Sequence, residues 1–521
     1  MRHLNKIEIE QLSTQQRCWA EDWNNIIVAD DFQVSSLRNS NFYGRVQIGS
    51  GATITDVKMI KGSMSQGNKP NVISVLNEGG DGNVVLCPQL TAQLAWLMIN
   101  HKPVFELCLK EESKAQGMVS ESASESESRP RMIVCDYAKI EGASKIVDCI
   151  IQSSQDSPTY VGADVIMEKC VTACGAEVTD AAKVYECFVG EAVHIGKAFS
   201  AEASLFFANA YMDNGEACAA VCGPFACSHH KSTLLIGGEF SFYNAGSNTN
   251  QSNHAYKMGP IHWGTLQRGA KTASGCHILW PATIGVFSMV MGKVVQHPDL
   301  SNLPFSYVFG DGNKTYVYPG TNIKTVGTWR DVNKWPTRDK RNNSQPYQDL
   351  ITFDFPNPYI LQYVAEGKKI LQTLLTTLSD ENDEYIYEGC IIKKKAAEKG
   401  IKYYDIILGL TRKSESASES ASESSYVDMF GFIAKESAVE NLILKVGNGK
   451  ITSIDDLCAE IPSLAVPQMT IDKEGEAYRQ WLELIERDAR KEFNMGDVSE
   501  EQLHDFISKL QWKTSNHLLH K

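Results

Sequence analysis

Aliphatic residues recur every six positions in the first part of the chain. Ile48, Ile54 and Ile60 follow this period, and the stretch IGSGAT that begins at Ile48 has a glycine after the aliphatic residue and a small residue at its fifth position. This period fits neither the helical repeat nor the simple alternation of a strand. It fits a coil with three flat faces, in which each hexad makes a short strand and a turn and the aliphatic side chain points inward.

The same period returns after an interruption. Further hexads begin at Ile140, Ile146, Val161, Val178, Val184, Val189, Ile195 and Ala201. Such a dense run of repeats predicts a solenoid, in which each coil packs on its two neighbours.

With these hexads the chain resembles the left-handed parallel β-helix superfamily of hexapeptide-repeat proteins, best known for sugar and lipid-A acyltransferases. The resemblance covers residues 40–62 and 131–300. The whole sequence is also similar to a family of uncharacterised bacterial proteins, of bacteroidete type, that carry this coil with long extra segments. The resemblance implies a mainly β fold, built on a left-handed parallel β-helix, and a homotrimer with sites between neighbouring copies.

The remaining segments interrupt or flank this coil. Helical spacing after residue 357 and in 388–412, 427–446 and 473–515 predicts a C-terminal α-helical region, and a helix around 13–23 is expected to cap the other end. We therefore expect six parts: an N-terminal helical cap over 1–39, a first coil over 40–62, an inserted subdomain over 63–130, a site-bearing coil over 131–300, a connector over 301–350 and a helical region over 351–521.

The composition of the chain limits the kinds of partner that it can bind. The formal net charge of −13 gives no basic surface for nucleic acid or an anionic membrane. No apolar run is long enough to span a bilayer, and the first 23 residues are too polar and acidic for a targeting peptide. We expect a cytoplasmic protein that binds a small molecule. Two Ser/Glu-rich segments, 120–128 and 414–424, cannot bury surface and are left out of the functional reasoning.

The stretch CAAVCGPFACSHH over 218–230 raises the question of a metal site. Its spacing lacks the C-x2-C pair that fixes two zinc ligands in ribbons and knuckles. Cys170, Cys174 and Cys187 lie in clear hexads with no histidine beside them, which indicates that this chain uses cysteine as a small core or corner residue. We therefore favour reduced structural thiols, while metal binding by Cys218, Cys222, Cys227, His229 and His230 stays open.

The hexads fade from Asp213 to Lys271, where polar side chains gather. Polar loops on a rigid coil are a common place for a binding site. His254 is the first candidate for a general base and His229 the second, because an imidazole can take a proton near neutral pH. The candidate substrate-binding residues, whose amides and cations suit hydroxyl and phosphate groups, are Asn248, Asn253, Lys257, His230, His262, Arg268 and Lys271.

The plainer alternative is that these asparagines form ladders at solenoid turns and that the histidines are satisfied surface groups. His194 ends a clean hexad at an outward position, so we interpret it as a surface residue. A basic segment with interleaved tryptophans, over 329–341, either presents cations to a ligand held by the coil or packs its aromatics on the coil end.

These features favour a transferase acting on a sugar, a nucleotide-sugar or another phosphorylated small molecule. Acyl transfer with a histidine base is the leading chemistry, and acyl-coenzyme A is a candidate donor; no cofactor is identified. The alternatives are a binding or scaffold protein on the same coil and, third, a metal-dependent lyase or hydratase. The glycine-rich stretch at 79–82 lacks the lysine of a phosphate-binding loop, so we interpret it as a turn.

Overall fold

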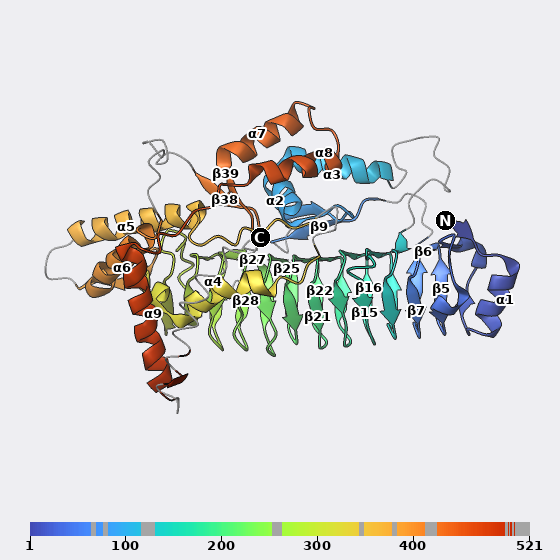
Figure 1. The fold of residues 1–521 in the computed structure, drawn as a ribbon, viewed down its shortest axis with the longest axis horizontal. Coiled ribbons are helices and arrows are strands. Elements are labelled where there is room, and N and C mark those ends of the chain that lie inside the picture. Colours follow the sequence, from blue (N-terminus) through green and yellow to red (C-terminus); the bar gives the residue numbers. More distant parts are fainter. Residues whose placement is uncertain are drawn as a thin grey trace.

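Short parallel strands wind into a solenoid of about 14 turns in the computed structural model of this chain (Figure 1). The structure describes residues 1–63, 69–76, 82–115, 131–252, 263–342, 348–377, 383–411 and 425–494, with a few positions beyond them. The aliphatic residues that open the hexads point inward, and Ile48, Ile54 and Ile195 have no exposed surface. The mainly β solenoid predicted from the six-residue period is confirmed.

The strands lie on three faces, visited in turn by each coil. The first face consists of β3 (Ile26–Val28), β6 (Val46–Ile48), β11 (Met132–Val134), β14 (Ile150–Ile151), β17 (Val171–Thr172), β20 (Phe188–Val189), β23 (Leu205–Phe206), β29 (Gly264–Leu266) and β32 (Thr283–Ile284). The second face consists of β4 (Leu37–Arg38), β7 (Thr53–Thr55), β12 (Lys139–Glu141), β15 (Tyr160–Val161), β18 (Glu177–Val178), β21 (His194–Gly196), β24 (Tyr211–Asp213), β26 (Cys227–Ser228), β30 (Lys271–Thr272), the start of β33 (Met289–Val294) and β34 (Tyr307–Asp311).

The third face is built in the same way. It consists of β2 (Trp19–Ala20), β5 (Asn41–Gly44), β8 (Ile60–Gly62), β13 (Lys145–Val147), β16 (Ile166–Glu168), β19 (Lys183–Tyr185), β22 (Ser200–Glu202), β28 (Asn250–Ser252) and β31 (His277–Leu279). Two longer strands, β25 (Glu216–Cys222) and β27 (Leu234–Phe240), begin on the third face and end on the first.

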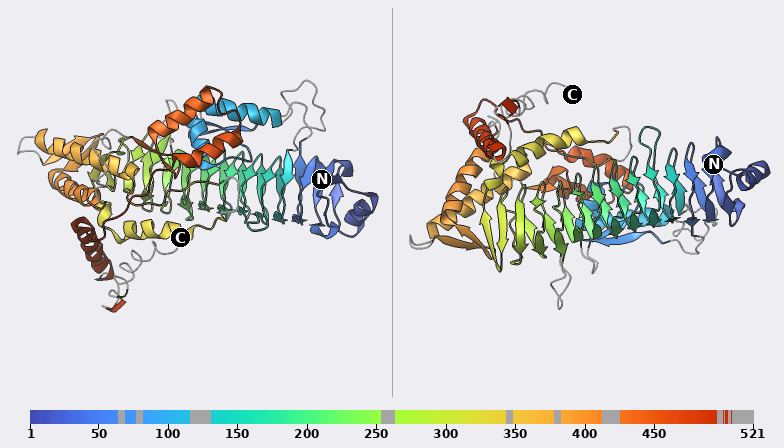
Figure 2. Two further views of the ribbon diagram at one scale, coloured as in Figure 1. Left: turned by 45° about the horizontal axis from the view of Figure 1, so that its top comes forward. Right: turned by 90° about the horizontal axis from the view of Figure 1, so that it is seen from below.

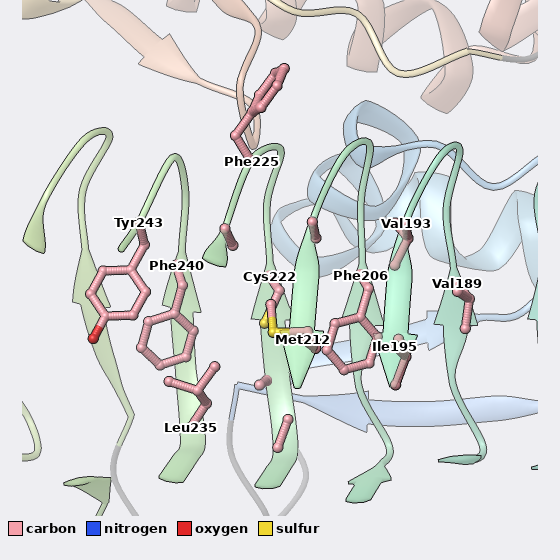
Figure 3. Close-up of a cluster of buried hydrophobic side chains, with 14 of the residues drawn as sticks. Val189, Val193, Ile195, Phe206, Met212, Cys222, Phe225, Leu235, Phe240 and Tyr243 are labelled. Atoms are coloured by element: carbon pink, nitrogen blue, oxygen red, sulfur yellow. The ribbon is translucent and has the colours of Figure 1, made fainter. Parts of the chain in front are cut away.

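The interior is a stack of equivalent side chains from successive coils. Val161, Val178, Ile195 and Met212 pair in register along the second face, and all four are buried. Figure 3 shows the stack continuing through aromatic residues such as Phe206, Phe240 and Tyr243. Because neighbouring coils are about 4.8 Å apart, equal positions in consecutive coils are in direct contact.

Two segments that are far apart in the sequence, the insertion and the C-terminal part, cover the first face. The insertion contributes β9 (Val72–Val75), β10 (Gly82–Val85), α2 (Ala92–Asn100) and α3 (Lys102–Ala115), and the C-terminal part contributes β38 (Tyr426–Asp428), β39 (Ile433–Lys435), α7 (Glu436–Gly447) and α8 (Ile454–Glu460). They pack on outward apolar residues of the coil such as Val171, Phe188 and Leu205. Figure 1 shows α2, α3, α7 and α8 together above this face.

Helices and a β-hairpin close the C-terminal end of the coil. Strand β34 pairs with β35 (Lys314–Tyr318), and β35 pairs with β37 (Cys390–Lys393). Strand β37 in turn pairs with β36 (Glu384–Tyr387). Helices α5 (Pro358–Thr377) and α6 (Lys394–Leu408) pack beside them. A Cβ atom at Gly367 of α5 would lie 2.2 Å from the carbonyl oxygen of Asn302, so this glycine permits the close approach of α5 to the last coil.

The N-terminal end differs from the sequence expectation. Helix α1 (Lys6–Thr14) begins earlier than the predicted helix at 13–23, because Asn5 and Glu8 form a reciprocal capping box at its start. The segment after α1, preceded on the sheet by β1 (Arg2–His3), already belongs to the coil through β2 and β3. No helix in the described ranges combines the length and apolar character needed to cross a lipid bilayer.

Candidate functional site

Helix α4 (Val326–Arg338) runs back along the ridge between the first and second faces (Figure 2). Thr325 caps its first turn, and Trp335 packs between the rings of Phe242 and Phe287, at centroid distances of 4.6 and 5.7 Å. An ion pair between Lys271 of β30 and the fully buried Asp331 ties the helix to the second face. This helix lies within the segment 301–350, which the sequence predicts only as a connector.

The tryptophans of the basic segment pack against other aromatic side chains, whereas presentation of its cations to a ligand stays a prediction. Trp329 and Trp335 are buried. The segment after α4 continues along the ridge, where Asn209 donates to Asp339 over 2.9 Å. This path brings cationic side chains of the segment beside the second face. These are Lys334, Arg338, Lys340 and Arg341.

A column of outward residues on the second face lies next to this segment. Glu177, His194, Tyr211 and Cys227 occupy the same position in four consecutive coils and pair in register. They are 16 or 17 residues apart in the sequence, which is the length of one coil. The column therefore gathers a carboxylate, an imidazole, a phenol and a thiol into one row.

His194 is fixed on three sides. Its Nδ1 lies 3.1 Å from Glu177 Oε2, and its Nε2 lies 3.2 Å from Asp213 Oδ1. The ring stacks on Tyr211 at 4.4 Å with an angle of 17° between the planes. Asp213 is fully buried and is also bound by Lys197, 2.7 Å away, whereas the Glu177 side chain is half exposed. Asp213 is thus the rigid partner and Glu177 the one that a ligand can displace.

A cavity of about 220 Å³ opens beside His194. Its polar lining includes Glu177, Glu191 and His194 of the coil and Lys340, Arg341 and Asn342 after α4, together with Asp156, Ser157 and Cys174. Burial raises the pKa of the Glu191 carboxyl to about 8, with the charge of Asp349 adding to the rise and Arg341 opposing it. In its protonated form this carboxyl can both donate and accept a hydrogen bond, which suits contact with a hydroxyl group.

A cysteine and a histidine lie in contact two coils along the column. Cys227 Sγ lies 3.0 Å from His229 Nδ1, and the His229 and His230 rings are 4.1 Å apart. Burial raises the pKa of the Cys227 thiol to about 11, while the charges of Lys334 and Arg338 act to lower it. Burial and the neighbouring His230 lower the pKa of His229. Both histidines are exposed, so a ligand can reach them.

The other residues predicted for the site are placed differently. Arg268 is buried, and its guanidinium donates to the Asp428 carboxylate and to the carbonyls of Thr352 and Gly431, so it joins the coil to the C-terminal part. Lys271 is held by Asp331. Asn248 is exposed in a left-handed turn, where its backbone N–H donates to the carbonyl of Lys231. His254, Asn253, Lys257 and His262 lie outside the described residues.

The cysteines of the stretch 218–230 point in different directions. Cys218 faces outward on the third face, Cys222 lies in the interior (Figure 3), and Cys227 faces outward on the second face. His277 lies on the third face, away from His229. Among the residues that the structure describes, no three His, Cys, Asp or Glu side chains come together in a way that could hold a metal ion.

Sequence reasoning missed the central part of this site. His194 is only slightly exposed and bound to two carboxylates, and Cys227 is paired with an imidazole. A usable signal was present, because Glu177, His194 and Tyr211 repeat at the length of one coil. The hexad period identifies inward aliphatic residues, whereas the site lies at outward positions one coil apart.

Comparison with known proteins places the chain in a family. The family described as "Domain of unknown function (DUF4954)" matches residues 1–58 and 46–375. The chain belongs to this family. No curated protein matches it. Among solved structures, it is similar to one titled "putative acetyltransferase" from Desulfovibrio desulfuricans G20, with 8% identity and a TM-score of 0.13, over 56% of this chain and 71% of that chain. A TM-score this low carries no argument about activity.

Proposed function

We propose that the chain is a transferase that moves an acyl group from an anionic donor to a hydroxyl-bearing small molecule, such as a sugar or a nucleotide-sugar. The observation that carries the proposal is the second face itself. There an exposed imidazole, His229, lies 3.0 Å from Cys227, on which Lys334 and Arg338 of α4 act with positive charge, and a polar cavity lies two coils away at His194.

His229 is the general base in this proposal. Its lowered pKa keeps the imidazole neutral near pH 7, so it is ready to accept a proton from an attacking group. Both nitrogens of His194 already have carboxylate partners, which suits a residue that binds and orients better than one that accepts a proton. His254, the first candidate from the sequence, stays a prediction.

The donor and the acceptor bind at opposite ends of the column in this proposal. Lys334 and Arg338 suit the phosphates of a donor such as acyl-coenzyme A. The acceptor places one end in the cavity and its reacting hydroxyl near His229, two coil spacings or about 10 Å away. An acceptor of disaccharide or nucleotide-sugar length spans this distance.

The test is release of coenzyme A from acetyl-coenzyme A in the presence of sugars, sugar phosphates and nucleotide-sugars. His229→Gln is expected to lower kcat by about 100-fold or more, because general base catalysis contributes at least that much. His194→Gln is expected to raise KM more than it lowers kcat. His277→Gln, on the third face, is the matched control and should leave both unchanged.

The alternative is a non-catalytic binding protein on the same coil. It predicts that no donor is turned over, while a sugar or nucleotide-sugar still raises the melting temperature and His194→Gln abolishes that rise. This result would overturn the proposal.

A further inference from the structure

Cys227 differs from the structural cysteines of the coil in what its sulfur contacts. The thiols of Cys170 and Cys187 donate to backbone carbonyls inside the coil, at 3.2 and 3.1 Å. The Cys227 sulfur instead lies 3.0 Å from an imidazole nitrogen, on the outer surface of the second face. A thiol and an imidazole at hydrogen-bond distance are the minimal parts of a nucleophile and its base.

In the resting state both groups of the pair are neutral. The raised pKa of Cys227 leaves the sulfur protonated near neutral pH, and the lowered pKa of His229 leaves the imidazole neutral. In the tautomer whose proton is on Nε2, the thiol donates in this contact and His229 Nδ1 accepts. The pair rests as a thiol with a base beside it, and the thiolate forms when His229 takes the proton.

Charged groups around the pair favour the thiolate once it forms. Lys334 and Arg338 of α4 act on Cys227 with positive charge, whereas Asp213 acts with negative charge. Asp213 also favours a positive charge on His229, whereas His230 and Lys197 oppose it. Two cations thus face the sulfur, and one buried carboxylate faces the imidazole that would become charged.

We infer that Cys227 is a covalent acyl carrier, which accepts the acyl group of a thioester donor and passes it on with His229 as the base. This inference rests on the proposed function, because it uses the same donor and the same base. It changes the route from direct transfer to transfer in two steps.

The atoms balance in both steps. In the first, His229 takes the proton from Cys227, the thiolate attacks the thioester carbonyl, and a carbon–sulfur bond to Cys227 replaces the one to the donor. The donor leaves as a thiol with the proton from His229. In the second, His229 takes the proton of the acceptor hydroxyl, whose oxygen attacks the carbonyl of the acyl-cysteine, and the new carbon–oxygen bond replaces the carbon–sulfur bond to Cys227. The proton returns to the Cys227 sulfur, so no oxidant or reductant is needed.

The experiment uses the full chain with acetyl-coenzyme A and no acceptor. Mass spectrometry of the intact protein and of its peptides is expected to show one acetyl group, on Cys227. Cys227→Ala should abolish this label, and His229→Gln should slow its formation by about 100-fold. Cys218→Ser is the matched control, since Cys218 is half-buried and outward on the neighbouring face of the same coil, and it should label like the unmodified protein.

The outcomes separate the two proposals. Turnover that persists in Cys227→Ala, with no acetyl-cysteine in the unmodified protein, would overturn the covalent route and leave the transferase intact. Absence of both label and turnover would overturn both. Pulse alkylation of the unmodified protein with iodoacetamide needs no variant: Cys227 should react faster than Cys218, and equal rates would contradict its activation by His229.

Discussion

Cysteine has two different uses in this chain, and its position in the coil separates them. At one corner of the coil, the side chains of Cys149, Cys170, Cys187 and Ser204 each donate to the carbonyl two residues earlier. That corner accepts a small side chain with one donor, and a thiol serves as well as a hydroxyl. Cys170 and Cys187 are buried, as predicted, whereas Cys174 is half-buried and lines the cavity beside His194.

Gly196 allows His194 and Asp213 to meet. A Cβ atom there would lie 2.7 Å from His194 Nε2 and 3.0 Å from Asp213 Oδ1. We expect Gly196→Ala to push the imidazole away from the carboxylate and to raise KM for the acceptor, with a loss of stability of about 1 kcal/mol. NMR of the His194 ring and steady-state kinetics would detect the change.

The control for this substitution is Gly447→Ala, at the end of α7, where nothing lies near the added methyl group. If Gly196→Ala binds the acceptor as well as the unmodified protein, the contact between His194 and Asp213 is not needed for binding.

Glu191 makes folding stability depend on pH. Its pKa in the folded chain, about 8, is above the ordinary value for a carboxyl. Its stabilising contribution is complete below the ordinary carboxyl pKa and is lost as the pH rises toward 8, because only the unfolded chain ionises freely over that range. We therefore expect Glu191 to make the free energy of unfolding fall by about 1 kcal/mol per pH unit over this range. Glu191→Gln should remove this fall.

Urea unfolding at several pH values between about 5 and 8 measures this dependence. The exposed Glu141, on the same face, provides the control Glu141→Gln, which should leave the slope unchanged. An unaltered slope in Glu191→Gln would show that this carboxyl ionises normally in the folded chain.

At the scale of elements, strands of two or three residues persist here because each is hydrogen-bonded to the coil on either side. The turns between them use left-handed residues that are not glycine, including Asp180, Lys197 and Asn214 with φ of 51°, 47° and 57°. Such residues are costly in isolation, and repetition of the coil holds them in place. The hexad pattern identifies these elements because every coil repeats the same local environment.

Helix α4 is the element on which the site depends most. Trp335 anchors it to Phe242 and Phe287. We expect Trp335→Ala to lower the free energy of unfolding by about 3 kcal/mol through the cavity it leaves. It should also loosen the helix, which withdraws Lys334 and Arg338 from the second face and weakens donor binding.

Hydrogen exchange over 326–342, together with chemical denaturation, tests this expectation. Arg330→Ala is the matched control, because the Arg330 side chain is 67% exposed. Equal exchange protection in Trp335→Ala and the unmodified protein would mean that other contacts hold α4 in place.

At the scale of the whole molecule, the three faces have different surroundings. The insertion and the C-terminal part cover the first face, α4 flanks the second, and ion pairs such as Lys145 with Glu168, at 2.6 Å, run along the third. The homotrimer implied by the superfamily stays a prediction. In the described residues, the candidate site is built from one chain, since α4 supplies its cations.

The insertion protects apolar surface that the coil would otherwise expose. Replacing residues 63–130 by a two-residue turn, like the one between β13 and β14, would uncover outward residues such as Val171, Phe188 and Leu205. We expect the shortened chain to self-associate and to bind a hydrophobic dye, because apolar patches of this size drive aggregation. Light scattering and dye fluorescence would measure this.

A second shortened chain, with Phe188→Ser and Leu205→Ser added, should associate less. A monodisperse shortened chain without these substitutions would show that the C-terminal part alone covers the first face.

The sequence by itself determined the coil. An inward aliphatic residue every six positions is a local property that each coil repeats, so the period predicts the solenoid and its buried residues without knowledge of distant contacts. The sequence also named His229 and His230, and it drew attention to the basic segment after residue 328.

Only the tertiary structure decided which outward residues meet. Lys334 acts on Cys227 across more than 100 residues, and Arg268 is bound to Asp428 within the scaffold. His194 lies between two carboxylates, Glu177 and Asp213, which neighbouring coils supply. These contacts depend on how coils stack and where α4 folds back, because electrostatic and hydrogen-bond partners are set by distance in space. The one-coil spacing of Glu177 and His194 does not by itself show that their side chains meet.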